Sequence, residues 1–189
     1  MSMPPRQRAD AAKNRERIVV EARDLFSSAT DPVSLEAIAR AAEVGIGTLY
    51  RHFPTKEALV EAVYRAELDA LEREADALLA LHSGFDAMRR WLDRYAGFVA
   101  TKHAMHDALR IALTPRSGPI SETRVRVRET IAKFLAAGAR DRSLRSDVQA
   151  DDLTIGFAGA VFATTASPDR AQAGRVLDLL MAGLRPAAP

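Results

Sequence analysis

Apolar residues recur at intervals of three and four along most of this chain, which is the spacing of one face of an α-helix. The alternation of Arg and Val over 124–128 resembles a strand, but the wider spacing around it favours a helix. The spacing predicts helices over 13–28, 34–42, 46–53, 55–81, 84–102, 104–113, 119–139, 151–166 and 168–184. We therefore expect an all-α fold.

Two of these helices are short and lie close together. In the first, Leu35, Ile38, Ala39 and Ala42 share one face, and Ser34 is a suitable N-cap. After an interruption at 43–45, the second presents Leu49 and Phe53 four residues apart, so that both point inward. Two short helices joined by a tight turn are typical of a helix-turn-helix.

The outward positions of the second short helix carry polar and aromatic side chains that suit phosphates and base edges better than a solvated surface. They are Ile46, Thr48, Tyr50, Arg51 and His52. An ordinary helical corner is the alternative, because this geometry also occurs in proteins that do not bind DNA.

The segments IARAAEV and GTLYRHFPTKEALVEAV carry a more specific signal. Over 14–64 the chain resembles the N-terminal domain of the TetR-type family of bacterial transcriptional regulators, although that family usually has glycine where this chain has Glu43. The resemblance implies a three-helix DNA-binding domain followed by a helical domain for effector binding and dimerisation. We place a flexible basic arm at 1–12 and the two domains at 13–58 and 59–185.

By this resemblance, Tyr50, His52 and Lys56 contact phosphates, with Ser34 and Thr48 helping. Because Gly45 and Gly47 carry no hydrogen-bonding side chain, we expect bases to be read by Ile46, against a thymine methyl, and by Arg51, against guanine. The predicted DNA-binding residues are Ser34, Gly45, Ile46, Gly47, Thr48, Tyr50, Arg51, His52 and Lys56. The basic residues of the N-terminal segment either form a solvated tail or reach the backbone and minor groove.

The amino-acid composition limits the classes of protein to which this chain can belong. The chain is 48% apolar but only 6% aromatic, and its net charge of +2 does not by itself indicate nucleic acid. It has no cysteine, which excludes disulfides and thiol chemistry. No apolar run reaches the about 20 residues that a membrane helix needs, and no signal-peptide pattern opens the chain. We expect a cytoplasmic protein without a membrane partner.

We find no catalytic pattern and predict no catalytic residues, metal site or cofactor. His103 and His106 have a spacing that a metal could use but lack partners other than Asp107, and Asp151 with Asp152 fits the charge of a helix start. No glycine-rich phosphate loop or nucleophile elbow is present. The chain is predicted not to be an enzyme.

An aromatic stripe at helical spacing is the candidate effector pocket. It consists of Met88, Trp91, Tyr95 and Phe98, with His106 and Arg110 as polar partners. Such a stripe can equally be plain core. In a chain so poor in aromatic residues, however, the clustering suits an apolar small-molecule site.

The last two predicted helices combine small residues on one with branched residues on the other. A hairpin buried inside the subunit is one interpretation. The resemblance instead implies a four-helix dimer interface, with candidate residues Ile155, Gly159, Phe162, Val176, Leu180 and Leu184.

Three functions follow from these patterns. The first is a repressor that binds a pseudo-palindromic double-stranded DNA operator as a homodimer and is released by a small-molecule effector. The second is a regulator with the same DNA-binding head but no such effector. The third is a helical small-molecule-binding protein or enzyme whose helix-turn-helix is vestigial.

Overall fold

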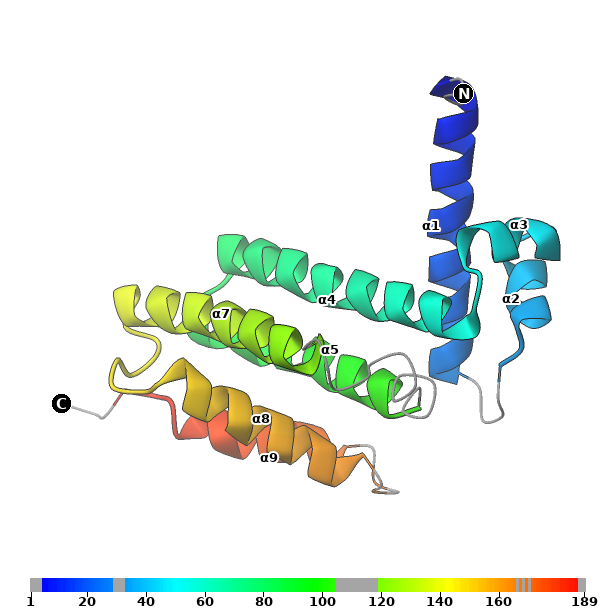
Figure 1. Cartoon of the computed structure of the whole chain (residues 1–189). Coiled ribbons are helices and arrows are strands. Elements are labelled where there is room, and N and C mark those ends of the chain that lie inside the picture. Colours follow the sequence, from blue (N-terminus) through cyan, green and yellow to red (C-terminus); the bar gives the residue numbers. More distant parts are fainter. Residues whose placement is uncertain are drawn as a thin grey trace. The chain divides into compact units, whose positions relative to one another are not determined.

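Every regular element in the described part of the chain is an α-helix, as predicted (Figure 1). The computed structural model describes residues 5–28, 33–104, 119–165, 167, 169 and 171–186. The helices are α1 (Pro5–Ser28), α2 (Leu35–Ala41), α3 (Ile46–His52), α4 (Lys56–Leu81), α5 (Gly84–Ala104), α7 (Pro119–Arg140), α8 (Ala150–Thr164) and α9 (Gln172–Ala182). The helix predicted over 104–113 falls almost wholly outside the described residues.

The chain forms two compact units, and α4 runs from the first into the second. The first unit comprises Met1–Ala66 with Ala104–Thr114, and the second comprises Glu67–His103 with Pro115–Pro189. In the first unit α1, α2 and α3 all contact one another (Figure 1). The side chains buried at their junction are Ile18, Ala22, Ile38, Ala39, Ala42, Leu49 and Phe53.

The first helix is longer than its apolar pattern indicated. It begins at Pro5 rather than at residue 13, so the segment expected to be an arm is helical over most of its length. Proline is well suited to the first position of a helix, and the Arg, Gln and Ala residues that follow it have good helix propensity. Periodicity missed this part because its buried apolar contacts begin only at Ile18.

The second unit is built around an aromatic core on α5. Trp91 is 1% exposed, lies stacked on Tyr95 with ring centroids 5.2 Å apart, and meets Phe134 of α7 at 5.6 Å. Its indole nitrogen donates to the Leu71 carbonyl oxygen at 2.9 Å, so this large side chain is buried with its polar atom satisfied. Further along the chain, α7 packs on α8, and α8 on α9.

Side-chain hydrogen bonds to the backbone account for where two helices of this unit begin. Ser83 opens α5: its hydroxyl accepts from the Asp86 backbone N–H at 3.1 Å and donates to the Asp86 carboxylate at 3.0 Å. The predicted start of α9 at residue 168 was wrong, because the helix begins at Gln172. Ser167 and Asp169 instead accept backbone N–H bonds two residues ahead, and these turns delay the helix.

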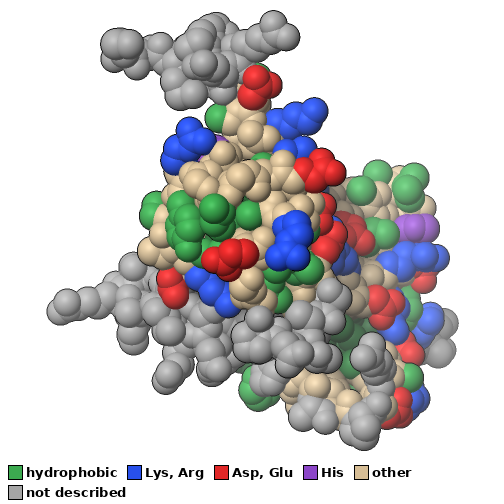
Figure 2. Space-filling view, turned by 90° about the vertical axis from the view of Figure 1, so that its right-hand side faces the viewer, with side chains coloured by type: hydrophobic (Ala, Val, Ile, Leu, Met, Phe, Trp, Pro, Cys, Tyr) green, Lys and Arg blue, Asp and Glu red, His purple; other side chains and the backbone are tan. Residues whose placement is uncertain are grey.

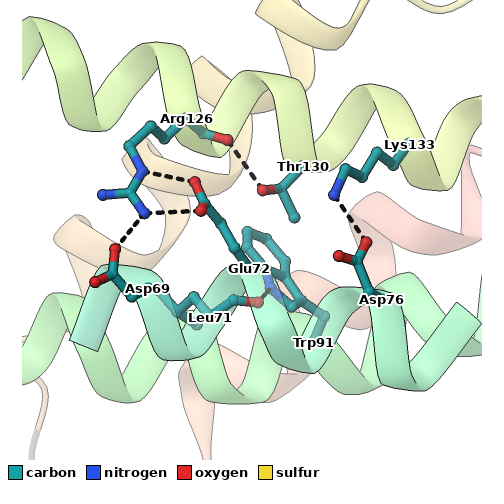
Figure 3. Close-up of polar contacts among 8 residues, drawn as sticks. All are labelled: Asp69, Leu71, Glu72, Asp76, Trp91, Arg126, Thr130 and Lys133. Carbon is teal, nitrogen blue, oxygen red and sulfur yellow. Dashed lines mark hydrogen bonds and ion pairs between the residues drawn. The ribbon is translucent and has the colours of Figure 1, made fainter. Parts of the chain in front are cut away.

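Charged side chains join α4 to α7 within the second unit (Figure 3). Arg126 donates two hydrogen bonds to Glu72, at 2.6 and 2.7 Å, and a third to Asp69 at 2.6 Å. Farther along, Lys133 donates to Asp76 at 2.7 Å. The carboxylates hold the pKa of Arg126 above its usual range, with the Glu72 hydrogen bonds as the main cause. The residues that resembled a strand are therefore helical and tied to α4.

We expect Arg126→Ala to lower the free energy of unfolding by about 1–2 kcal/mol, because it removes a bidentate, charge-assisted contact on a side chain that is only 20% exposed. Lys133→Ala, which removes one contact of a 49% exposed side chain, should cost about 0.5 kcal/mol or less. Urea unfolding of both variants tests the difference. Equal losses would mean that the bidentate geometry adds no stability.

Candidate nucleic-acid interface

The α2 helix starts as its sequence predicted. The Ser34 hydroxyl accepts a hydrogen bond from the Ala37 N–H at 3.1 Å, which satisfies one of the unpaired donors at the helix start. Ile38 and Ala39 are buried on the face toward α1 and α3. Ser34 itself remains exposed.

The turn between α2 and α3 depends on a residue in an unusual conformation. Glu43 has φ of 51°, in the left-handed region that side chains other than glycine rarely adopt. Arg17 of α1 reaches this residue: one guanidinium nitrogen donates to the Glu43 carbonyl oxygen at 3.3 Å, and another lies 3.7 Å from its carboxylate. The turn is thereby tied to α1.

The short helix α3 separates buried from exposed side chains largely as predicted, except that Thr48 and His52 are half-buried rather than exposed. Leu49 and Phe53 are buried, at 0% and 2% exposure, whereas Ile46 and Tyr50 are 39% and 46% exposed. Ile46 and Tyr50 are four residues apart, so both lie on one exposed face of this short helix. The outward face of α3 therefore offers an aromatic hydroxyl and an apolar tip to a partner.

Arg51 is exposed but folded back on its own helix. Its Nε donates to the Gly47 carbonyl oxygen at 3.3 Å, and a terminal nitrogen donates to the Thr48 hydroxyl at 2.9 Å. A bidentate contact with guanine requires both terminal guanidinium positions or one of them with Nε. Arg51 would have to leave Gly47 or Thr48 to read a base.

Lys56 has a structural contact that the sequence did not reveal. Its ammonium donates to the Val33 carbonyl oxygen at 2.6 Å and is half-buried, which links the start of α4 to the residue before the α2 cap. An ammonium has three donors, so two remain for a phosphate. Thr55 caps the same helix by accepting from the Ala58 N–H at 3.2 Å.

Neither of the two glycines at the start of α3 is required by its backbone angles or by packing. Gly45 is the N-cap with ordinary extended angles, and neither it nor Gly47 has a positive φ. A Cβ atom added at either position would meet nothing within 4 Å. Glycine without a conformational or packing reason fits a surface that another molecule must approach closely.

The face that carries α2 and α3 is not dominated by one charge. Figure 2 shows basic and acidic side chains interspersed among its described residues. Arg15 lies over the Phe53 ring, with 5.1 Å between its guanidinium carbon and the ring centroid. Attraction to phosphates must therefore come from local groups at α3 and α1 rather than from a broad basic field.

The candidate effector residues of the second unit form part of its core. Met88, Trp91, Tyr95 and Phe98 are all less than 10% exposed, while His106 and Arg110 lie outside the described residues. A polar pair that the sequence analysis missed lies in the same unit: Glu67, 5% exposed, accepts from Arg94 at 3.1 Å. Its signal was available, since Glu67 interrupts the apolar positions Val63 and Leu71 at intervals of four.

The candidate dimer residues differ in exposure. Ile155, Phe162 and Leu180 are 56%, 64% and 37% exposed, Gly159 is exposed, and Val176 is half-buried. Leu184 is buried inside its own unit, at 5%. Leu179, which the sequence analysis had not named, is 74% exposed.

The described residues contain no group of three or more His, Asp or Glu side chains that could hold a metal ion. Within the same part of the chain, no helix combines the length and apolar character needed to cross a membrane.

Each of the two units contains a segment that matches a model of a known protein family. Residues 18–63 match the model of bacterial regulatory proteins of the tetR family, and residues 83–186 match the C-terminal domain of SbtR-like transcriptional regulators. The chain belongs to the TetR family. As a member it is a DNA-binding transcriptional regulator, with α2 and α3 as its helix-turn-helix.

Solved structures of TetR regulators agree over nearly the full length. A TetR transcriptional regulator of Streptomyces coelicolor is 38% identical with a TM-score of 0.82, over 92% of this chain and 99% of that one. One from Mycobacterium vanbaalenii is 31% identical with a TM-score of 0.69, over 95% and 99%. An HTH-type transcriptional regulator of Staphylococcus aureus is 33% identical over 52% of this chain and 54% of its own length. This chain thus matches only about half of that curated relative.

For this TetR regulator, Gly47→Ala should weaken operator binding about tenfold or more, because the added methyl group occupies the surface that DNA must approach. The fold should not suffer, since alanine in a helix is favoured over glycine by about 1 kcal/mol. Fluorescence anisotropy with operator DNA and thermal unfolding measure the two effects.

Gly97→Ala is the matched control, because Gly97 is an exposed helical glycine of α5 that also has open space around it. It should keep wild-type DNA affinity. Unchanged operator binding by Gly47→Ala would show that DNA does not approach α3 at this residue.

Proposed function

We propose that this TetR regulator is a repressor that binds a pseudo-palindromic operator in the cytoplasm as a homodimer and is released by a small molecule bound in its second unit. The observation that carries the proposal is the exposed apolar face of α8 and α9. Family membership supports the DNA-binding part. The dimer and the effector rest on the arguments below.

The two last helices expose apolar side chains at positions that share a face. Ile155 and Phe162 are seven residues apart on α8, so they lie two turns apart on one side with Gly159 between them. Leu179 and Leu180 are exposed on the neighbouring helix α9. Clustered apolar exposure of this kind marks an interaction surface, and a two-fold dimer buries the same patch on both subunits.

A dimer also meets the needs of DNA recognition. The helix α3 has seven residues, so a single copy reaches few bases. Two copies related by a two-fold axis read two half-sites about one helical turn apart, which doubles the contacts and makes the operator palindromic. In this proposal Tyr50, His52 and Lys56 hold the phosphates, while Ile46 and Arg51 contact bases.

We expect Phe162→Glu to convert the dimer to a monomer, since it places a charge in the interface. It also removes the about 1.5–3 kcal/mol that each subunit would gain by burying this aromatic side chain. Operator affinity should fall with it although α3 is untouched. Analytical ultracentrifugation and anisotropy test both effects together. Val125→Glu, at an apolar residue of α7 with 43% exposure, is the control and should remain dimeric. A dimeric, operator-binding Phe162→Glu variant would refute the interface.

The packing of the second unit supports an effector that acts by changing its shape. The rings of Trp91 and Tyr95 are stacked and Tyr95 also contacts Phe98, at 6.3 Å between centroids, so a ligand inserted along this stripe must separate side chains. Such a ligand binds a rearranged state better than the packed one, and that difference in affinity is what shifts a regulator between two states. Glu67 and Arg94 provide charged groups to orient it.

The test of this part uses a compound found by thermal-shift screening that releases operator DNA. Since Trp91 is the only tryptophan, its emission should change on binding, and Tyr95→Ala should weaken binding about tenfold or more. Arg128→Gln, on the exposed face of α7, should bind the compound normally. Unchanged Trp91 emission together with full affinity of the Tyr95 variant would place the effector elsewhere.

A further inference from the structure

A hollow on the second unit lies where the chain leaves α7 and where it continues beyond α9. Its volume is about 600 Å³, within the range of small-molecule sites. The lining residues are Ala139, Arg142, Leu144, Arg145, Ser146, Asp147, Arg185 and Pro186. Three arginines and one aspartate thus line this space, together with apolar side chains. We refer to it as the arginine hollow.

The backbone around the hollow is fixed by bonds that do not use these arginine side chains. The Asp141 carboxylate accepts from the backbone N–H of Gly84 at 2.8 Å and from that of Ser143 at 2.9 Å. The hydrogen bond of the Ser143 hydroxyl, together with these two backbone bonds, holds the pKa of Asp141 below its usual range. The Ser143 hydroxyl accepts from the Phe85 N–H at 3.0 Å. The Arg145 N–H donates to the Leu184 carbonyl oxygen at 2.9 Å. These bonds hold the loop without using the side chains of Arg142, Arg145 and Arg185.

The arginines are placed in three different ways. Arg145 makes two bonds of 2.6 Å to Asp147, which fixes its plane and neutralises its charge. Arg185 lies over the Phe85 ring with its guanidinium carbon 4.2 Å from the centroid, a contact that orients the group and keeps its charge. Arg142 is exposed, has φ of 60°, and forms no ion pair with any described residue.

We propose that the arginine hollow binds a small organic anion through a phosphate or carboxylate group. Arg142 and Arg185 supply the uncompensated charge, and guanidinium groups match the oxygens of both anions bidentately. Leu144 and Ala139 offer apolar contact to the rest of the molecule. None of the residues that line this site belongs to the aromatic stripe on α5.

The test titrates inorganic phosphate and, separately, citrate into the full-length protein at constant ionic strength, with chloride as the replaced ion. Two-dimensional ¹H–¹⁵N NMR follows the backbone amides of 142–147 and the Arg185 Nε–H. We expect saturable shifts at these positions with at least one of the two anions. Saturation by phosphate alone or by citrate alone identifies which group the hollow prefers.

The double variant Arg142→Asn, Arg185→Gln should bind about tenfold or more weakly, because two charge-assisted contacts are lost. Asparagine tolerates the left-handed backbone at 142, and the dispersed NMR spectrum confirms folding. Asp147→Asn should bind more tightly, since it frees Arg145 and removes the repelling carboxylate, while Arg128→Gln should match the wild type. Linear, unsaturated shifts with both anions, or equal affinity of the double variant, would overturn the proposal.

Discussion

A helix of seven residues is not stable alone in water, and the reading of DNA by this protein depends on overcoming that limit. The helix α3 persists because Leu49 and Phe53 are buried against α1 and α2, and because its first turn is closed on the Gly45 carbonyl oxygen by two backbone bonds of 2.8 and 3.1 Å. Its outward side chains are consequently held by packing on the opposite side. Any change that loosens the junction of the three helices also disorders the groups that meet DNA.

The second unit is stabilised in a different way from the first. Its helices are long, and an apolar core around Trp91 and Phe134 supplies most of the cohesion, while charged groups such as Arg126 at the edge fix the register of α4 against α7. The first unit therefore rests on a small junction of short helices, whereas the second rests on long helices around a buried aromatic core.

Most of the fold could be predicted from the sequence, because helical periodicity and caps are local properties. Ser34 caps its helix and Leu49 and Phe53 point inward, as expected. The errors lie where no apolar residue marks a boundary, as at Pro5, or where turns compete with a cap, as at Asp169. The tertiary contacts of Lys56 and Arg126 could not be predicted, since a sequence shows which side chains are charged but not which oxygens lie within their reach.

The turn before α3 has a consequence for how this regulator can change over evolutionary time. Glu43 adopts a backbone conformation that glycine accepts without strain, and its carboxylate lies 3.7 Å from an arginine on α1. Exchange for glycine, which a single base change in a glutamate codon accomplishes, would relieve the backbone and free that arginine from its counter-ion at once. One mutation outside the reading helix can thus remove both the backbone strain of this turn and the charge at residue 43, with every side chain of α3 left unchanged.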